Sequence, residues 1–328
     1  MPKIHFLNVN DGDCIVLEHD SGRVTVFDIS AGNIPRQRSA LSEVPAKWDI
    51  QSAKGNYRMC KHPTNPLDYL AKMGIKSIWR FILSHPDMDH LDGFNALLDE
   101  FSVLNFWDSG AKKHKPDFSS YGVYNEKDWD RYTKVVAGNE PGTNSIQLQA
   151  GEQFKYANED DINGVGDALY ILAPNQELVD EGNKKQDFND ASYIVLFCSA
   201  IGKVLLAGDA HDTTWEYVKE NYKDHVSNVD LLIAPHHGRK SGRSYDFLEY
   251  VNPKLTFFGC APSEHLAYDA WNYRNLAHIT NNQCGCIVAE EGSGGGMAIY
   301  VENGRFAINS GGDIRRTNKQ GFHYLCSV

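Results

Sequence analysis

Four apolar, strand-like runs of this chain end in aspartate or histidine, and this pattern limits the available folds more than any other feature of the sequence. The runs are VTVFD, ending in Asp28, SIWRFILS, leading into His85–His90, KVLLAGD, ending in Asp209, and LLIAPHH, ending in His236 and His237. Because one sheet edge can collect the ends of several strands, we expect these side chains to share one rim. Helical patterns lie between the strands, so the sequence predicts an α/β (α+β) fold.

The segment SHPDMDH places His85, Asp87, Asp89 and His90 within six consecutive residues. Pro86 restricts the residue before it to extended backbone, in which side chains two positions apart point the same way. The first two groups can therefore converge. The last two are expected at the start of a helix, since apolar residues recur at helical spacing after them. Two ligand pairs facing two nearby points suit two metal ions. The competing interpretation is a solvated acidic turn that caps a helix.

The other patterns predict a single domain, residues 1–328, with polar insertions at about residues 32–66 and 111–145. Strands are expected at KIHFLNV, CIVLEH and RVTVFDIS, joined by hairpin turns at NDGD and DSGR, and later at ALYILAP, ASYIVLFCSA and KLTFFGCA. Helices are expected at PLDYLAKMG, which Gly74 ends, and at TTWEYVKENY. The dipeptide Asn303-Gly304 between alternating runs predicts a type I′ hairpin.

Charge and cysteine content exclude several classes of protein. The net charge is −11, which disfavours a nonspecific binder of duplex DNA. The seven cysteines are scattered and odd in number, as expected of thiols in a reducing cytoplasm. The C-x-C pair of Cys284 and Cys286 has no further ligands close in sequence, so a zinc site is not expected there. No secretory signal or membrane-spanning run is visible, and we expect a cytoplasmic protein without a membrane partner.

The motifs SHPDMDH, AGDA and APHHG together resemble those of the metallo-β-lactamase fold. More narrowly, the chain is similar to the hydrolase domain of ComEC-type bacterial competence DNA-uptake proteins, through FLNVNDGDCIVLE, VTVFDIS and NDASYIVL. The resemblance covers about residues 4–265 and leaves the two insertions unmatched. It implies an αββα sandwich with a metal site along one edge.

The resemblance also implies a role for each residue at the strand ends. The implied assignments are His85 and Asp87 on the first metal, Asp89, His90 and His237 on the second, Asp209 bridging both, His236 facing substrate or acting as an acid, and Asp28 orienting a ligand histidine. The catalytic residues are then expected to be Asp89, Asp209 and His236.

Two departures from the family pattern concern the metals. Asp87 stands where a histidine is common, and a carboxylate is a harder donor, so Mn²⁺ suits the site of two divalent ions as well as Zn²⁺. The family often supplies another histidine before the AGDA motif, and no strand end here carries one. The first metal is therefore expected to be weakly held, with Asn189 or water filling in.

Basic residues near these motifs bear on the substrate. Arg239, Lys240 and Arg243 directly follow the paired histidines, where the family often has serine. The first insertion carries six basic residues against two acidic ones, with Trp48 and Tyr57 among them. Arginine binds phosphate oxygens through its planar fork, and aromatic rings can stack on bases. An ordinary solvated loop explains this composition equally well.

The sequence therefore predicts a metal-dependent hydrolase of phosphodiester bonds, a phosphodiesterase or nuclease acting on a nucleotide or on nucleic acid. The acidic total favours a small or single-stranded substrate. A hydrolase of esters, thioesters or amides would use the same centre and stays open. A partner-regulated effector or binding module also stays open, because the first metal site is incomplete and the insertions could bind a protein partner.

Overall fold

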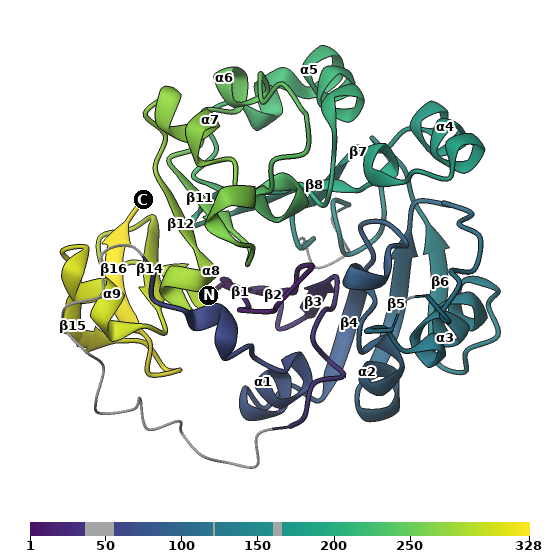
Figure 1. Ribbon diagram of the computed structural model, residues 1–328, viewed down its shortest axis with the longest axis horizontal. Coiled ribbons are helices and arrows are strands. Elements are labelled where there is room, and N and C mark those ends of the chain that lie inside the picture. Colours follow the sequence, from purple (N-terminus) through teal and green to yellow (C-terminus); the bar gives the residue numbers. More distant parts are fainter. Residues whose placement is uncertain (37–55, 121, 160–165) are drawn as a thin grey trace.

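The computed structural model describes residues 1–36, 56–120, 122–159 and 166–328, and two sheets dominate it (Figure 1). Among these residues the larger sheet has ten strands, in spatial order β15 (Asp313–Thr317), β16 (His323–Ser327), β14 (Met297–Val301), β13 (Ile287–Glu291), β1 (Lys3–Phe6), β2 (Ile15–Glu18), β3 (Val24–Phe27), β4 (Ser77–Ile82), β5 (Ser102–Asp108) and β6 (Asn144–Gln147). The smaller sheet has six, β12 (His278–Thr280), β11 (Leu255–Phe258), β10 (Leu231–Ile233), β9 (Gly202–Leu206), β8 (Ile194–Ser199) and β7 (Leu169–Ala173).

Helices cover the outer face of each sheet. The α-helices are α1 (Pro66–Lys72), α2 (Phe94–Glu100), α3 (Glu126–Val136), α4 (Gln176–Lys185), α5 (Asp212–Val226), α6 (Leu248–Val251), α7 (Tyr268–Tyr273), α8 (Asn281–Cys284) and α9 (Gly304–Asn309). Short 3₁₀ helices span Met59–Lys61, Met88–His90, Asn189–Ala191, Pro235–Gly238 and Ser263–His265. Figure 1 shows α1, α2 and α3 along the larger sheet and α5, α6 and α7 along the smaller one. No helix within the described ranges is long and apolar enough to cross a membrane.

Alternation along the strands produces this layering. In β2, Ile15 and Leu17 belong to the core between the two sheets, whereas Val16 packs in the core beneath α1 and α2. A strand that is apolar on both faces must be covered on both, and stacking sheet on sheet with helices outside achieves this. The expected αββα sandwich is confirmed.

Parallel pairing brings the polar strand ends together. β3 and β4 pair in parallel, as do β9 and β10. The carboxyl ends of parallel neighbours lie at the same edge, so Asp28 and His85 leave the larger sheet side by side, and Asp209 and His236 leave the smaller sheet in the same way.

Two expected helices are confirmed, and two local predictions are wrong. α1 begins after Asn65, whose side chain accepts from the Leu67 amide, and the chain turns at Gly74; α5 contains the expected helical segment. Asp89 and His90, however, lie on the 3₁₀ turn Met88–His90 and not on α2, which begins only at Phe94. The stretch 111–145, which the sequence predicts as a polar insertion, also contains a helix that sequence reasoning did not expect, α3, where Asn125 caps an amphipathic run. Residue 121 lies outside the description.

The type I′ hairpin predicted at Asn303-Gly304 is also wrong. The Asn303 side chain accepts from the amides of Arg305 and Phe306, which makes it the N-cap of α9. A type I′ turn requires positive φ at both central residues, whereas the φ of Asn303 is −82°. Asparagine favours both structures, and the packing of Phe306 in the core between the sheets selects the helix here.

Candidate metal centre

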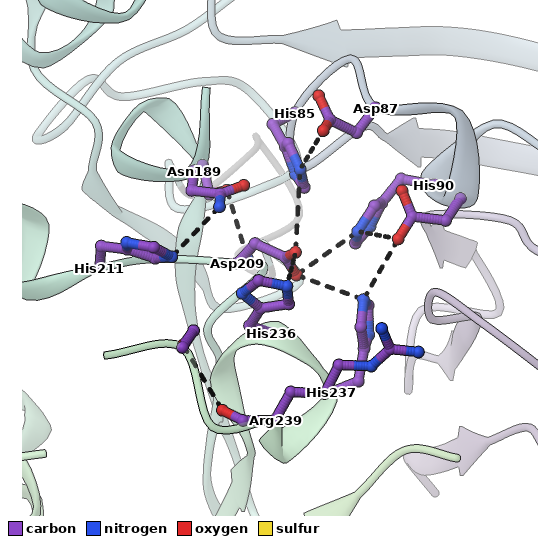
Figure 2. A network of polar contacts seen from close by, with 12 residues as sticks. His85, Asp87, His90, Asn189, Asp209, His211, His236, His237 and Arg239 are labelled. Atoms are coloured by element: carbon purple, nitrogen blue, oxygen red, sulfur yellow. Dashed lines mark hydrogen bonds and ion pairs between the residues drawn. The ribbon is translucent and has the colours of Figure 1, made fainter. Parts of the chain in front are cut away.

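Asp209 lies at the centre of the converging strand ends (Figure 2). Its Oδ1 is 3.4 Å from Nε2 of His90 and 3.6 Å from Nε2 of His237. Its Oδ2 is 4.0 Å from Nε2 of His85 and 3.6 Å from Nε2 of His236. One carboxylate therefore faces a different pair of imidazoles with each oxygen, which is the arrangement expected of a bridging ligand.

The two aspartates of SHPDMDH lie beside different histidines of the cluster. Oδ2 of Asp89 lies 3.5 Å from Nε2 of His237 and 3.8 Å from Nε2 of His90. Oδ2 of Asp87 lies 3.8 Å from Nε2 of His85. We call the group of His85 and Asp87 the first site and the group of Asp89, His90 and His237 the second site, with Asp209 between them.

Several donor atoms of the cluster are buried and have no hydrogen-bond partner in the described part of the chain. These atoms are Nε2 of His85, His90 and His237 and Oδ1 of Asp209. Leaving buried polar atoms unpaired is costly. Imidazole and carboxylate donors that point at common loci fit divalent cations. The residues present therefore suit the metal ions that the sequence predicts.

Buried carboxylates support both histidines of the second site from behind. Oδ2 of Asp28 lies 2.8 Å from Nδ1 of His90, and Oδ1 of Asp28 accepts from the amide of Ser84 at 2.7 Å. Oδ1 of Asp13 lies 3.1 Å from Nδ1 of His237. The Asp28 carboxylate accepts a hydrogen bond from Nδ1 of His90, and both carboxylates lie at the Nδ1 side of their imidazole, so that each Nε2 faces the cluster.

The backbone of the PHHG segment is not extended, as it would be if the strand-like run LLIAPHH continued through both histidines. His236 and His237 have φ angles of 53° and 56°, and the His236 amide donates to the carbonyl of Gly208. Packing enforces the tight turn, because a Cβ at Gly238 would lie 2.6 Å from the ring of Phe258. Both imidazoles consequently reach Asp209 instead of pointing to opposite sides of a strand.

The ring nitrogens nevertheless distinguish the two histidines. Arg243 donates from Nη2 to Nδ1 of His236 at 3.0 Å. Arginine is always a donor, so Nδ1 of His236 is the acceptor and the proton of the neutral ring is on Nε2. Burial lowers the pKa of His236 to about 4, consistent with a neutral ring. The side chain of His236 is 25% exposed, against 1% for His237.

Burial and the neighbouring charges shift the pKa values of the histidines in the cluster. Burial opposes the charged form of His90, but the carboxylates, above all Asp209, raise its pKa well above the ordinary value. Burial acts likewise on His237, and Asp13 with Asp209 raises its pKa to about 10. Burial and the neighbouring His90 lower the pKa of His85. A cation that enters the second site must therefore displace protons from its histidines.

The basic residues expected to bind substrate have different surroundings. Arg243 is buried and also donates to the carbonyls of Asp209 and Ala210, so it supports the centre from inside. Arg239 donates to Asp11 at 2.5 Å, and Nζ of Lys240 lies 3.6 Å from Asp269 at the surface.

Part of the basic insertion lies outside the described residues, namely Arg38, Glu43, Lys47, Trp48, Asp49 and Lys54. Of the described part, Arg36 pairs with Asp68 and Glu100. The ring of Tyr57 packs perpendicular to that of Phe306, with the ring centroids 5.5 Å apart.

Three residues near the site escaped sequence reasoning. Asp13 lies in NDGD, which reads as a hairpin turn, and Lys113 lies in the second insertion, yet its Nζ is 2.5 Å from Asp87. His211 follows Asp209 by two positions, and its Nε2 accepts from Asn189 at 3.1 Å. The side chain of Asn189, which the sequence predicts at the first site, therefore contacts His211. The only sequence signal for Asp13 was its place in the opening motif of the resembled family.

Comparison with known proteins identifies the fold. No family model matches the sequence, and no curated protein matches it. Among solved structures, Tm1679, a metal-dependent hydrolase of the β-lactamase superfamily, aligns with a TM-score of 0.50 at 13% identity, covering 85% of this chain and 96% of its own. A diphosphatase of the PhnP family aligns with a TM-score of 0.40 at 12% identity, covering 79% and 86%. The chain thus has the metallo-β-lactamase fold, as the similarity to Tm1679 shows.

Proposed function

We propose that this chain is a metal-dependent phosphodiesterase or nuclease that activates water at a dinuclear centre. The observation that carries the proposal is the carboxylate of Asp209, whose Oδ1 faces the imidazoles of His90 and His237 and whose Oδ2 faces that of His85. A structural ion would need only one closed set of ligands. A carboxylate shared between two adjacent sets suits a pair of ions that act on one substrate.

We assign the proposed ligands from the buried Nε2 atoms that have no hydrogen-bond partner in the described part of the chain, and from the carboxylates beside them. His85 and Asp87 would hold the first ion, Asp89, His90 and His237 the second, and Asp209 both. When bound, two divalent ions such as Zn²⁺ or Mn²⁺ acidify a water molecule and polarise a phosphoryl oxygen. Asp28 and Asp13 fix the ring orientation of the second-site histidines, so these donors need little rearrangement on binding.

His236 has a different proposed role. Its Nε2 carries the ring proton, because Nδ1 is committed to Arg243. Its partial exposure lets that N–H contact a substrate atom beside Asp209. The N–H would stabilise negative charge on a phosphoryl oxygen or protonate a leaving group. Arg243 is a positioning residue in this scheme, since it keeps the ring in the required tautomer.

Positive charge at the rim supports a phosphate-bearing substrate. Lys113 reaches Asp87, and Arg239 lies next to the paired histidines with 35% of its side chain exposed. A cavity of about 560 Å³ has Lys61 and His62 in its wall together with Asn10, which precedes Asp11 of the Arg239 pair. This cavity does not contain the cluster itself, so it would receive a distant part of the substrate. The motif resemblance to ComEC-type hydrolase domains supports nucleic acid or a nucleotide.

The test combines metal content with substrate choice. Freshly purified protein should contain divalent metal, and with added Mn²⁺ or Zn²⁺ it should hydrolyse bis(p-nitrophenyl) phosphate much faster than p-nitrophenyl acetate. Asp209→Asn, which keeps the side-chain shape, should lose this activity. Preference for the neutral ester would support the ester hydrolase. Absence of metal at every concentration would support the binding module and overturn the proposal.

A further inference from the structure

Lys113 makes a contact at the first site that no motif accounts for. Its Nζ lies 2.5 Å from Oδ1 of Asp87, and the side chains of the two residues are 19% and 34% exposed. The ammonium also lies 5.8 Å from the ring centroid of the buried Phe188. Lys113 therefore occupies one oxygen of a carboxylate whose other oxygen faces His85.

The backbone on both sides of Lys113 is fixed. The amide of Lys112 donates to Oδ1 of Asn183, and its carbonyl accepts from Nε2 of Gln186. The amide of His114 donates to Oε1 of Gln186 at 2.9 Å. The C-terminal end of α4 thus clamps the segment, so the Lys113–Asp87 contact depends little on ordering a free loop.

The two sites also differ in how their histidines are supported. His90 and His237 each have a buried carboxylate at Nδ1. Among the residues that the structure describes, Nδ1 of His85 has no carboxylate partner and contacts the hydroxyl of Ser84 at 3.0 Å. A carboxylate behind a ligand histidine raises its basicity and its affinity for metal, whereas a neutral hydroxyl does so less.

We infer that the two sites bind metal with unequal affinity, and that Lys113 lowers the affinity of the first site. The second site takes one divalent ion tightly. At the first site an incoming ion competes with the Lys113 ammonium for Asp87. A charge-assisted hydrogen bond of this kind changes a binding constant by about tenfold to a hundredfold. We expect the Lys113–Asp87 contact to weaken metal binding at the first site by that factor. The inference rests on the proposed dinuclear centre.

Calorimetric titration of the metal-free, full-length chain with Mn²⁺ tests it. The wild type should show one tight and one weaker binding event. Lys113→Met should tighten the weaker event by about tenfold or more and leave the tight event unchanged. Lys113→Arg keeps a cation and should behave like the wild type. Lys115→Met is the matched control, because Lys115 pairs with Glu126 and Asp130 in the same segment and should change neither event.

A second variant keeps the test decisive if Lys113→Met does not fold. Asp87→Asn removes both the ligand and the partner of Lys113, and it should abolish the weaker event while the tight one remains. Two equal events in the wild type, or a weaker event that Lys113→Met leaves unchanged, would overturn the inference without affecting the proposed centre. No binding in the wild type would overturn the proposed centre itself.

Discussion

The two adjacent histidines of PHHG share a sequence context but differ in which ring nitrogen a neighbour engages. Nδ1 of His237 lies 3.1 Å from the carboxylate of Asp13, and its Nε2 faces Asp89 and Asp209. Nδ1 of His236 accepts from Arg243, so its Nε2 carries the proton. The neighbour at Nδ1 therefore differs in charge between the two imidazoles, and on the proposed assignment His237 is a metal ligand and His236 a proton donor.

This difference predicts opposite phenotypes for the two alanine variants. His237→Ala should lower metal content, because the second site loses a buried donor. His236→Ala should keep the metal content but lower kcat by about a hundredfold, the scale of a lost general acid. Elemental analysis and steady-state kinetics with a phosphodiester measure both. Arg243→Gln, which can donate to Nδ1 without the charge, should fall between wild type and His236→Ala. Metal loss in His236→Ala would reverse the assignment.

Arg239 carries the second prediction at this scale. It pairs with Asp11, but the two side chains are 35% and 60% exposed, and such pairs contribute little stability. A substrate phosphate can therefore replace Asp11 at the guanidinium. Arg239→Ala should raise KM for a phosphodiester by about tenfold or more, with the larger effect at low salt, and leave KM for a neutral ester unchanged. Lys240→Ala is the control, because Lys240 pairs with the exposed Asp269 at the surface. Equal effects on both substrates would refute phosphate binding by Arg239.

At the scale of elements, the loop between β1 and β2 packs directly against the turn that carries Asp89. It supplies Asp13, and its Gly12 has a φ of 73°. A Cβ at Gly12 would lie 1.7 Å from the carbonyl oxygen of Asp89, so this loop and the 3₁₀ turn that carries Asp89 are in direct backbone contact. A shift of either segment would therefore move Asp13 or Asp89, which both lie beside His237.

Paired glycine variants separate this contact from backbone strain. Gly12→Ala should destabilise the protein by roughly 2–5 kcal/mol, because left-handed strain adds to the clash, and it should weaken metal binding at the second site. Gly22→Ala in the next turn has a similar φ, 80°, with open space around its Cβ. It should cost only about 1–2 kcal/mol and leave metal binding unchanged. Urea unfolding and metal titration measure the two effects, and equal metal affinity in both variants would show that the loop is not coupled to the site.

At the scale of the whole molecule, the burial of His19 between the two sheets makes the stability of the protein depend on pH. It follows β2, its ring meets Phe197 of the smaller sheet edge-on, and its Nε2 lies 2.8 Å from Oγ1 of Thr25. Burial lowers the pKa of His19 to about 4, from an ordinary value near 6.5. Between these values the unfolded chain binds a proton that the folded chain does not.

The contribution of His19 to stability is therefore complete above pH 6.5 and is lost as the pH falls to 4. The loss should reach about 3 kcal/mol, and His19→Gln should remove this part of the pH dependence. Urea unfolding of the metal-free protein at several pH values measures it, with the exposed His114→Gln as control. An unchanged slope in His19→Gln would mean that other groups cause the acid sensitivity.

The sequence by itself determined most strands and the main members of the candidate centre. Strand alternation and residues such as Asp28, His85 and Asp209 are local features, since each follows directly from the apolar run before it. The strand ends also predicted their convergence, which the structure shows, and the resemblance to a known fold added the αββα layer order. Their roles as ligands stay a prediction for metal titration to decide.

Only the tertiary structure decided which atoms face which. Asp13 and Lys113 lie far from SHPDMDH in sequence, and packing of distant segments brings them to the histidines and to Asp87. The turn at PHHG and the cap at Asn303 were mispredicted because short polar motifs are compatible with several backbone conformations of similar energy. A ring such as Phe258 or Phe306, packed from elsewhere in the chain, selects one conformation, and sequence spacing carries no record of that contact.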